Sequence, residues 1–474
     1  MVYDVIIVGA GPGGLYAAYE LTKKFGSGKK ILVIDAGNKL EDRKCPILEG
    51  TRKGCCNCNP CNIMQGFGGA GAFSDFKYNI TTHFGGTLAD KIGSEEALQL
   101  MKYVDTLNTK LLNDRVPKIF SSKNSIYRKK CIQNGLRLLD ADIRHLGTDN
   151  GQILLKKMYR DLKSVGVEFM FKTKINTFGW AWPYFQTRLE DGTLLQTKNI
   201  IFAVGRSGSK WMSEQCRDFR INTTSNRVDL GIRYELPYEV FSDLTDELYE
   251  SKIVYRTDTF EDNVRTFCMN PHGSVVTENT NGIVTVNGHS YEDPSKHTDN
   301  TNFALLVSQT FTAPFGKSNE YGESVARLSN DLANGNVLVQ RFGDLIKGHR
   351  TEQEDLINNS VIPTLKTAVA GNLSLCLPHR FCQDIIETIY ALNKIAPGTA
   401  NPDNLLYATE VKFYDSIVDV NENLEMAIEG YDENVHAYCI GDGSGITHSL
   451  SQAAASGVYV ARKIIENFEE KQNG

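Results

Sequence analysis

The chain opens with an apolar run, a glycine-rich turn and a segment of helical periodicity. Val5–Val8 is a continuous apolar stretch typical of a buried strand, and Leu15–Leu21 carries its apolar residues at helical spacing. A second expected strand, Lys30–Ile34, ends at Asp35. We expect the order strand, turn, helix, strand to form one βαβ unit of a parallel sheet.

The turn has the spacing Gly-x-Gly-x-x-Gly, formed by Gly9, Gly11 and Gly14. In a βαβ unit these glycines allow a tight turn, a close backbone approach to a pyrophosphate and close helix packing, while the helix N-terminus offers unpaired N–H groups to the anion. Asp35 lies about twenty residues further on, where a carboxylate can accept hydrogen bonds from ribose hydroxyls. The pattern predicts a dinucleotide site that consists of Gly9, Gly11, Pro12, Gly13, Gly14, Asp35 and Ala36.

Two later strand ends are expected to join this site. The stretch 198–204 has the character of a strand that ends at Gly205, and 437–440 runs into Gly441, Asp442 and Gly443 before a helix of small residues. The first resembles the Ala-Thr-Gly strand end of flavoproteins, and the second resembles the Gly-Asp pair of flavoproteins with two dinucleotide-binding domains. The resemblance implies FAD as the cofactor, with Asp442 hydrogen-bonded to its ribityl chain and the helix N-terminus facing the flavin.

The segment Gly66–Gly71 repeats the Gly-x-Gly-x-x-Gly spacing without its context. No expected strand precedes it, and no acidic residue follows at the distance of a ribose ligand. We interpret it as backbone that passes close to a flat ligand, the flavin ring or pyrophosphate, where a Cβ would collide. The residues expected to contact FAD there are Gly68, Gly69, Ala70 and Gly71. Without a second Rossmann unit, NAD(P)H is expected only as a transient electron donor.

A cysteine cluster lies just before this loop. Cys55, Cys58 and Cys61 are spaced Cys-x2-Cys-x2-Cys, and Cys45 precedes a proline upstream. Three thiolates on a tight loop suit an iron–sulfur cluster or zinc, with Cys45 or Cys56 as the fourth ligand, although the Cys-Pro pair stands on the opposite side from that of the ferredoxin run. A redox-active dithiol and reduced structural thiols are the alternatives.

Several stretches together resemble the family of uncharacterised FAD-dependent dehydrogenases, which is related in fold to glutathione-reductase-like flavoproteins. The stretches are Cys55–Ile63, Gly66–Asp75, Val264–Met269, Val286–Ser290, Glu410–Tyr414 and Gly441–Gly443. The chain departs from the family at His448, where arginine is usual, and at Asn270 and His272. The resemblance implies an α/β fold, in which a discontinuous Rossmann-like FAD-binding domain carries an inserted β-rich α+β substrate or cap domain.

We expect the FAD-binding domain to combine residues 1–90, 145–215 and 400–474. Residues 91–144 form a helical excursion, and residues 216–399 form the substrate or cap domain. Four residues of the insert are expected on strand ends that reach the open flavin face, namely Arg265, Cys268, Asn287 and His289. Cys268 and His289 are the candidate catalytic residues, and His289 suits acid–base chemistry because the unperturbed pKa of histidine is near neutrality.

Composition narrows the class of protein without identifying a substrate. A length of 474 residues favours two domains, and a formal net charge of −6 gives no basic field for nucleic acid. The chain offers no signal peptide or spanning helix, and its 11 cysteines fit reduced thiols in the cytoplasm. We expect an FAD enzyme that transfers a hydride between flavin and a small organic substrate. The alternatives are an electron-transfer flavoprotein with a cysteine-bound metal centre and a non-catalytic FAD-binding protein, and the oligomeric state is open.

Overall fold

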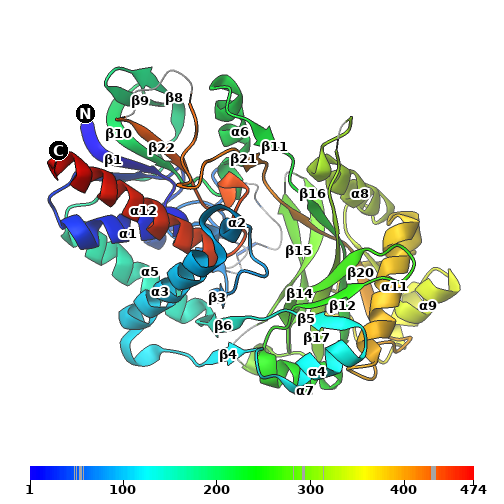
Figure 1. The fold of residues 1–474 in the computed structure, drawn as a ribbon. Helices are drawn as coiled ribbons and strands as arrows, with labels where there is room; N and C mark the ends of the chain where they lie inside the picture. The colour runs from blue at the N-terminus through cyan, green and yellow to red at the C-terminus, as the bar shows by residue number, and fades with distance from the viewer. Residues whose placement is uncertain are drawn as a thin grey trace. The chain divides into compact units, whose positions relative to one another are not determined.

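The computed structural model divides the chain into two compact units, each assembled from separated stretches (Figure 1). The structure describes residues 1–46, 49, 51–52, 56, 58–280, 282–290, 294–312, 314–428 and 434–473. Unit 1 comprises Met1–Ile119, Ile143–Asn226 and Tyr414–Gly474. Unit 2 comprises Phe120–Asp142 and Arg227–Phe413. Each unit therefore depends on contacts between residues that are distant in the sequence.

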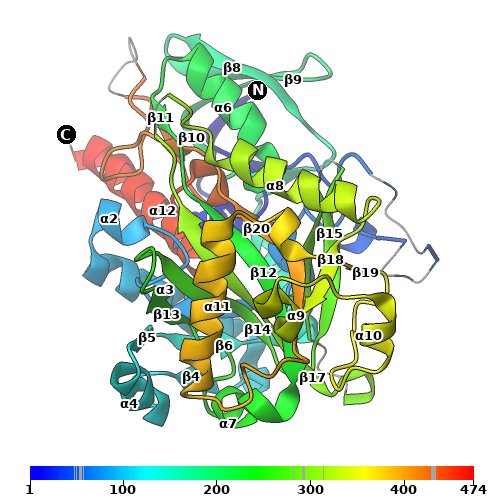
Figure 2. The ribbon, with the colours of Figure 1, turned by 90° about the vertical axis from the view of Figure 1, so that its right-hand side faces the viewer.

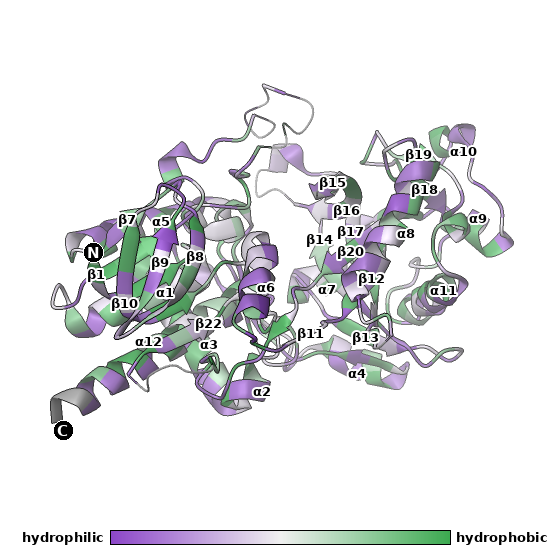
Figure 3. Ribbon diagram, turned by 90° about the horizontal axis from the view of Figure 1, so that it is seen from above, coloured by the Kyte–Doolittle hydropathy of each residue, from purple (hydrophilic) through white to green (hydrophobic). Residues whose placement is uncertain are grey.

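Unit 1 is built on a sheet that has seven strands among the described residues. Its order is β7 (Glu168–Met170), β2 (Ile31–Ile34), β1 (Val2–Val8), β10 (Leu194–Phe202), β9 (Tyr184–Leu189) and β8 (Ile175–Ala181), and β22 (His436–Cys439) pairs with the second half of β10. The strands β7, β2, β1, β10 and β22 are parallel, whereas β9 and β8 are antiparallel. Figure 3 shows hydrophobic residues along the strands of this sheet. They are buried as in a parallel sheet covered on both faces, which confirms the expected α/β class.

Unit 1 has six α-helices among the described residues, and the first and last of them pack against each other. They are α1 (Pro12–Phe25), α2 (Leu88–Ile92), α3 (Ser94–Leu112), α5 (Gly147–Ser164), α6 (Ser209–Asp218) and α12 (Leu450–Asn473). A Cβ on Gly457 of α12 would lie 2.1 Å from the carbonyl oxygen of Gly13 in α1. The missing side chain therefore lets the two helix backbones touch, and this joins both ends of the chain in one core.

Short elements complete unit 1 and mark its boundaries. Within the unit, β3 (Lys77–Ile80) follows the glycine segment, and β11 (Thr223–Thr224) pairs with β21 (Ile417–Val418). The strands β4 (Ile119–Ser121) and β6 (Asp142–His145) contain positions at which the chain passes from one unit to the other. Within the described residues, no helix combines the length and apolar character needed to cross a membrane.

Unit 2 is built on a mostly antiparallel sheet that has eight strands among the described residues. Its order is β19 (Val369–Ala370), β18 (Leu338–Arg341), β20 (Leu405–Phe413), β12 (Val228–Pro237), β17 (Asn300–Gln309), β14 (Asn263–Asn270), β13 (Ile253–Arg256) and β5 (Leu136–Leu138). Its helices are α4 (Ile126–Gln133), α7 (Tyr238–Leu248), α8 (Ser318–Leu332), α9 (Phe342–Lys347), α10 (Gln353–Ile357) and α11 (His379–Asn393). Figure 2 shows α8 and α11 lying over the strands.

The two faces of this second sheet differ in character. Alternate residues of β12, such as Leu230, Ile232 and Tyr234, belong to the apolar core under the helices. The residues between them include Arg233 and Glu235, which are also fully buried. The hairpin of β15 (Ser274–Thr280) and β16 (Ile283–His289) packs on the strands. The sheet thus has one hydrophobic face and one face of buried polar residues.

Candidate functional site

The turn between β1 and α1 has the backbone that its glycines predict. Gly9 has a φ of 111°, and a Cβ there would lie 2.1 Å from the carbonyl oxygen of Ala203. A Cβ on Gly14 would lie 2.0 Å from the carbonyl oxygen of Gly9. Gly11 is the N-cap of α1 and provides no capping side chain, and the first helical turn holds no acidic residue. The helix therefore presents its N–H groups and positive end to an anion.

The Gly66–Gly71 segment lies directly against this turn. The N–H of Gly68 donates to the carbonyl oxygen of Ala10 at 2.8 Å. Gly69 has a φ of 60°, and a Cβ there would lie 3.0 Å from the Cα of Gly11. The two glycine segments, Gly9–Gly14 and Gly66–Gly71, therefore meet backbone to backbone. We call this pair of segments the glycine cradle, and a side chain at their contact would occupy the space between the two backbones. This arrangement fits the close approach of a dinucleotide, because backbone N–H groups can reach its pyrophosphate.

Asp35 stands at the end of β2 and uses both carboxylate oxygens to hold the turn. The N–H of Ala10 donates to Oδ2 at 2.8 Å, and the N–H of Gly37 donates to Oδ1 at 2.7 Å. Burial raises the pKa of Asp35, while these N–H groups act in the opposite direction. A carboxylate has about four acceptor sites, so Asp35 retains acceptor capacity for a ribose hydroxyl beside these N–H groups. Ala36 follows Asp35 in the same half-buried turn.

Arg43 is a residue of the site that sequence reasoning missed. Its guanidinium donates to the carbonyl oxygens of Asn62 at 2.9 Å, Ile63 at 2.7 Å and Phe67 at 2.6 Å. The side chain is buried, and burial lowers the pKa of Arg43 to about 10, so it keeps its charge at neutral pH. Arg43 thus anchors the backbone that leads into the glycine cradle. A single arginine outside any motif gave no signal for this role.

Sequence reasoning also missed the adjacent glycines Gly85 and Gly86, which contact residues at the start of α12. The N–H of His448 donates to the carbonyl oxygen of Gly85 at 2.8 Å. Gly86 has a φ of 135°, and a Cβ there would lie 2.5 Å from Oε1 of Gln452. The Gln452 amide also donates to the carbonyl oxygen of Phe84 at 3.0 Å. The adjacent glycines were the signal that could have revealed this segment.

The loops after β10 and β22 come together as expected for one site. Gly205 and Gly441 have φ values of 63° and 70°, and a Cβ on Gly443 would lie 2.9 Å from the carbonyl oxygen of Gly205. The hydroxyl of Thr447 donates to Oδ1 of Asp442 at 3.1 Å. Burial raises the pKa of Asp442 to about 6, and Arg206 and the Thr447 hydrogen bond act against this rise. Unit 1 therefore brings strand ends from all three of its stretches into one region.

The cysteine segment is only partly described. Cys55 lies outside the described residues, whereas Cys45, Cys58 and Cys61 lie within them. The described residues contain no group of three or more His, Cys, Asp or Glu side chains arranged to hold a metal ion. Arg52 donates to Sγ of Cys56 at 3.0 Å. Metal binding by Cys45, Cys55, Cys58 and Cys61 stays a prediction.

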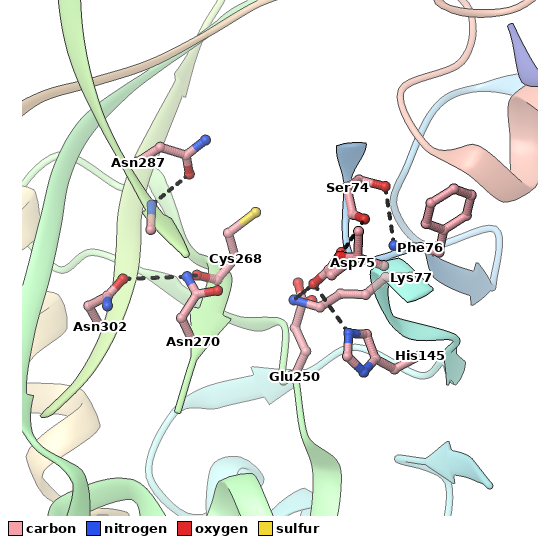
Figure 4. Close-up of polar contacts among 12 residues, drawn as sticks. Ser74, Asp75, Phe76, Lys77, His145, Glu250, Cys268, Asn270, Asn287 and Asn302 are labelled. Atoms are coloured by element: carbon pink, nitrogen blue, oxygen red, sulfur yellow. Dashed lines mark hydrogen bonds and ion pairs between the residues drawn. The ribbon is translucent and has the colours of Figure 1, made fainter. Parts of the chain in front are cut away.

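The candidate residues of unit 2 border a buried polar network. Cys268 lies in an irregular part of β14 with a φ of 44°, and its carbonyl oxygen accepts from Arg233 at 2.7 Å. Arg233 also donates to Oδ1 of Asn287 at 2.9 Å and forms an ion pair with Glu410 at 2.8 Å. Asn270 donates to the carbonyl oxygen of Cys268 at 2.8 Å, and in Figure 4 the Cys268 sulfur points away from Asn270. The network therefore joins Cys268 and Asn287.

The other two candidates of unit 2 lie at the edges of this region. His289 ends β16 opposite Ser274. Arg265 forms an ion pair with Asp229, which is fully buried. Arg227 also pairs with Asp229, so the ion pair gives Arg265 a structural partner in the sheet, and the expected reach of Arg265 to the flavin face stays a prediction.

A separate charged cluster in unit 1 surrounds Asp75. Lys77 Nζ lies 3.0 Å and His145 Nε2 lies 3.6 Å from Oδ2 of Asp75, as the ion pairs in Figure 4 show. Burial acts to raise the pKa of Asp75, but Lys77 and His145 outweigh it and hold that pKa well below its ordinary value. The cluster fixes the chain just after the glycine segment.

Comparison with known proteins agrees with this site. Residues 212–413 match the family model of the FAD-dependent protein, C-terminal domain-like, and residues 7–40 match the NAD(P)-binding Rossmann-like domain. The matches confirm the resemblance to FAD-dependent proteins and the presence of a Rossmann-like nucleotide-binding domain. An uncharacterized protein of Clostridium beijerinckii is 24% identical over 487 residues, covering 98% of this chain and 81% of the relative.

Two solved structures are similar over nearly the whole chain. L-proline dehydrogenase from P. horikoshii is 13% identical with a TM-score of 0.40, covering 98% of this chain and 93% of that one. Glycine oxidase from Geobacillus kaustophilus is 9% identical with a TM-score of 0.39, covering 98% and 95%. Similarity at this level says nothing about the reaction of this chain.

Proposed function

We propose that unit 1 binds FAD and that the protein transfers a hydride between the flavin and an organic substrate, as a dehydrogenase or reductase. The observation that supports this most is the cradle in which Gly69 meets Gly11, because two glycine segments in backbone contact suit a ligand that needs close approach. Asp35 and Asp442 supply carboxylates at two further points of the same unit.

Each part of the cradle has a distinct task in this proposal. The N-terminus of α1, with Gly11 to Gly14, holds the pyrophosphate, and Asp35 with Ala36 meets a ribose. Gly68 to Gly71 pass close to the cofactor, and Asp442, with Gly205, Gly441 and Gly443, holds the ribityl chain. When bound, FAD supplies the hydride acceptor or donor, and the protein supplies orientation and charge.

Unit 2 provides the substrate-binding residues in the same proposal. Cys268 and His289 are the proposed catalytic residues, with His289 as acid or base. The Arg233 network stabilises the strand from which Cys268 projects. We propose a cytoplasmic location and NAD(P)H as a transient electron donor.

The test is anaerobic reduction of the purified protein, followed by its visible spectrum. We expect the bound flavin to be bleached by dithionite and by NADH or NADPH, and then to be reoxidised by an organic acceptor. A flavin that no reductant bleaches would contradict an oxidoreductase and favour a non-catalytic role. Broad absorbance beyond the flavin bands, together with iron by elemental analysis, would instead support electron transfer through a cysteine-bound centre.

A further inference from the structure

A second carboxyl group, Asp415, lies beside Asp442 in unit 1. The amide of Asn226 donates to the carbonyl oxygens of Asp415 at 3.1 Å and Gly445 at 3.0 Å. A Cβ on Gly445 would lie 2.5 Å from the carbonyl oxygen of Ser416. The segment after β20 is therefore held tightly against the loop that contains Asp442.

The side chain of Asp415 has an unsatisfied oxygen. Its Oδ2 is buried and has no hydrogen-bond partner among the described residues. The groups that act electrostatically on this carboxyl are the Ser209 side chain, Arg206, Asp442 and the buried thiol of Cys439. An ionised carboxylate in this place would leave a buried acceptor without a donor, which is unfavourable.

The charges of this cluster balance only when one carboxyl is neutral. Arg206 carries a single positive charge and faces both Asp415 and Asp442. Burial raises the pKa of Asp415 to about 7, with Ser209 and Arg206 acting against the rise and Asp442 adding to it. Two partly buried carboxyl groups that repel each other titrate as a pair, and the first proton to leave comes off more easily than the second.

We propose that Asp415 and Asp442 hold one proton between them at neutral pH, and that Asp415 carries it as a positioning residue for the Asp442 carboxylate. This inference rests on the proposed function, because Asp442 is the residue proposed to hold the ribityl chain. With Asp415 neutral, Arg206 neutralises Asp442 alone and steadies its orientation. Loss of the shared proton adds a second negative charge to the same cluster and weakens FAD binding.

The expected signature is a fall in FAD affinity as the pH rises. If binding requires the protonated pair, the dissociation constant of FAD increases up to about tenfold per pH unit above the pKa of the pair. The first experiment is titration of the apoprotein with FAD between pH 6 and pH 8.5, for the wild type and for Asp415→Asn. The asparagine side chain is neutral and does not titrate in this range, so the dissociation constant of FAD for the variant should change little with pH. The matched control is Asp161→Asn in α5, whose carboxylate accepts from the Tyr19 hydroxyl, and it should keep the wild-type dependence.

A second measurement observes the proton itself, without catalysis. Infrared spectra of the apoprotein at pH 6.5 should contain a carboxylic-acid carbonyl band that Asp415→Asn removes and Asp161→Asn keeps. Arg206→Gln removes an exposed cation from the cluster, so the band should persist to higher pH. This variant keeps the test valid if Asp415→Asn fails to fold.

The outcomes separate the inference from the function on which it rests. An unchanged pH dependence of FAD binding in Asp415→Asn, or a carbonyl band that is absent or independent of Asp415, overturns the inference while FAD binding stands. A wild-type protein that binds no FAD overturns the proposed function and the positioning role together.

Discussion

The buried guanidinium of Arg43 offers a direct test at the scale of one residue. Replacing it in Arg43→Gln leaves carbonyl oxygens of Asn62, Ile63 and Phe67 without their donors. Each buried polar group left unsatisfied costs about 1–3 kcal/mol, so the free energy of unfolding should fall by at least about 2 kcal/mol. Denaturant unfolding of the apoprotein measures this change.

The control for Arg43 is an arginine whose ion pair is exposed. Arg256 pairs with Glu261 on the surface, with 66% of its side chain exposed. Exposed pairs contribute about 0–1 kcal/mol, so Arg256→Gln should leave the stability nearly unchanged. Equal effects of the two substitutions would show that the contacts of Arg43 do not anchor the glycine segment.

Asp384 of α11 gives a pH dependence of stability. It is fully buried, accepts from Thr257 at 2.7 Å and lies near Asp262 and Arg380. Burial raises its pKa from 3.8 to about 6, so the folded state holds the proton more tightly than the unfolded state. The resulting stability is complete below about pH 4 and is lost as the pH rises through 6, by up to about 3 kcal/mol.

The measurement for Asp384 is the unfolding free energy of wild type and Asp384→Asn between pH 4 and pH 7.5. The wild type should lose stability relative to the variant over this interval, because the variant has no proton to release. A difference that stays constant with pH would show that Asp384 is not protonated in the folded state.

At the scale of elements, a pair of substitutions distinguishes the effect of the contact between the two glycine segments from the effect of backbone strain. Gly69 and Gly166 both have positive φ values, 60° and 91°, but a Cβ on Gly69 meets Gly11 whereas one on Gly166 meets nothing within 4 Å. Alanine at either position carries a similar conformational cost of about 1 kcal/mol. Gly69→Ala should therefore lower FAD affinity at least about tenfold, the equivalent of 1.4 kcal/mol, while Gly166→Ala keeps it. Equal affinities in fluorescence titration would remove this segment from the proposed site.

The part of the candidate site that the sequence predicted is the part whose residues lie close together in the sequence. The turn Gly9–Gly14 and Asp35 depend on neighbours in one βαβ unit, so their spacing in the sequence carries the information. The contact of Gly69 with Gly11 was expected only as a close approach to a ligand. Arg43 acts through carbonyl groups that the fold brings near, and no spacing in the sequence records such contacts. The adjacent glycines Gly85 and Gly86 are visible in the sequence, but their contact with the start of α12 also depends on the fold.

The interior of unit 2 also contains contacts that the sequence pattern does not predict. Arg233 meets Asn287 and Glu410 because strand register and a hairpin place them on one face of the sheet. Alternation along β12 could have assigned Arg233 to a polar face, yet full burial of that face depends on the covering hairpin. The positive φ of Cys268 likewise follows from an irregular strand pairing that no residue pattern announces.

At the scale of the whole molecule, a dinucleotide would hold together stretches of unit 1 that are distant in the sequence. Gly11, Gly205 and Asp442 come from its three separate stretches. A ligand that binds only the folded state adds about 2.7 kcal/mol of stability at one hundred times its dissociation constant. FAD should therefore raise the melting temperature of the apoprotein, and this shift should shrink in Gly69→Ala.

The central claim is that unit 1 binds FAD, and equilibrium titration of the apoprotein with FAD tests it most directly. We predict saturable binding of a single FAD per chain by the wild type, with weakened binding in Gly69→Ala and wild-type binding in Gly166→Ala. Absence of saturable FAD binding by a wild-type apoprotein that unfolds cooperatively would contradict the account.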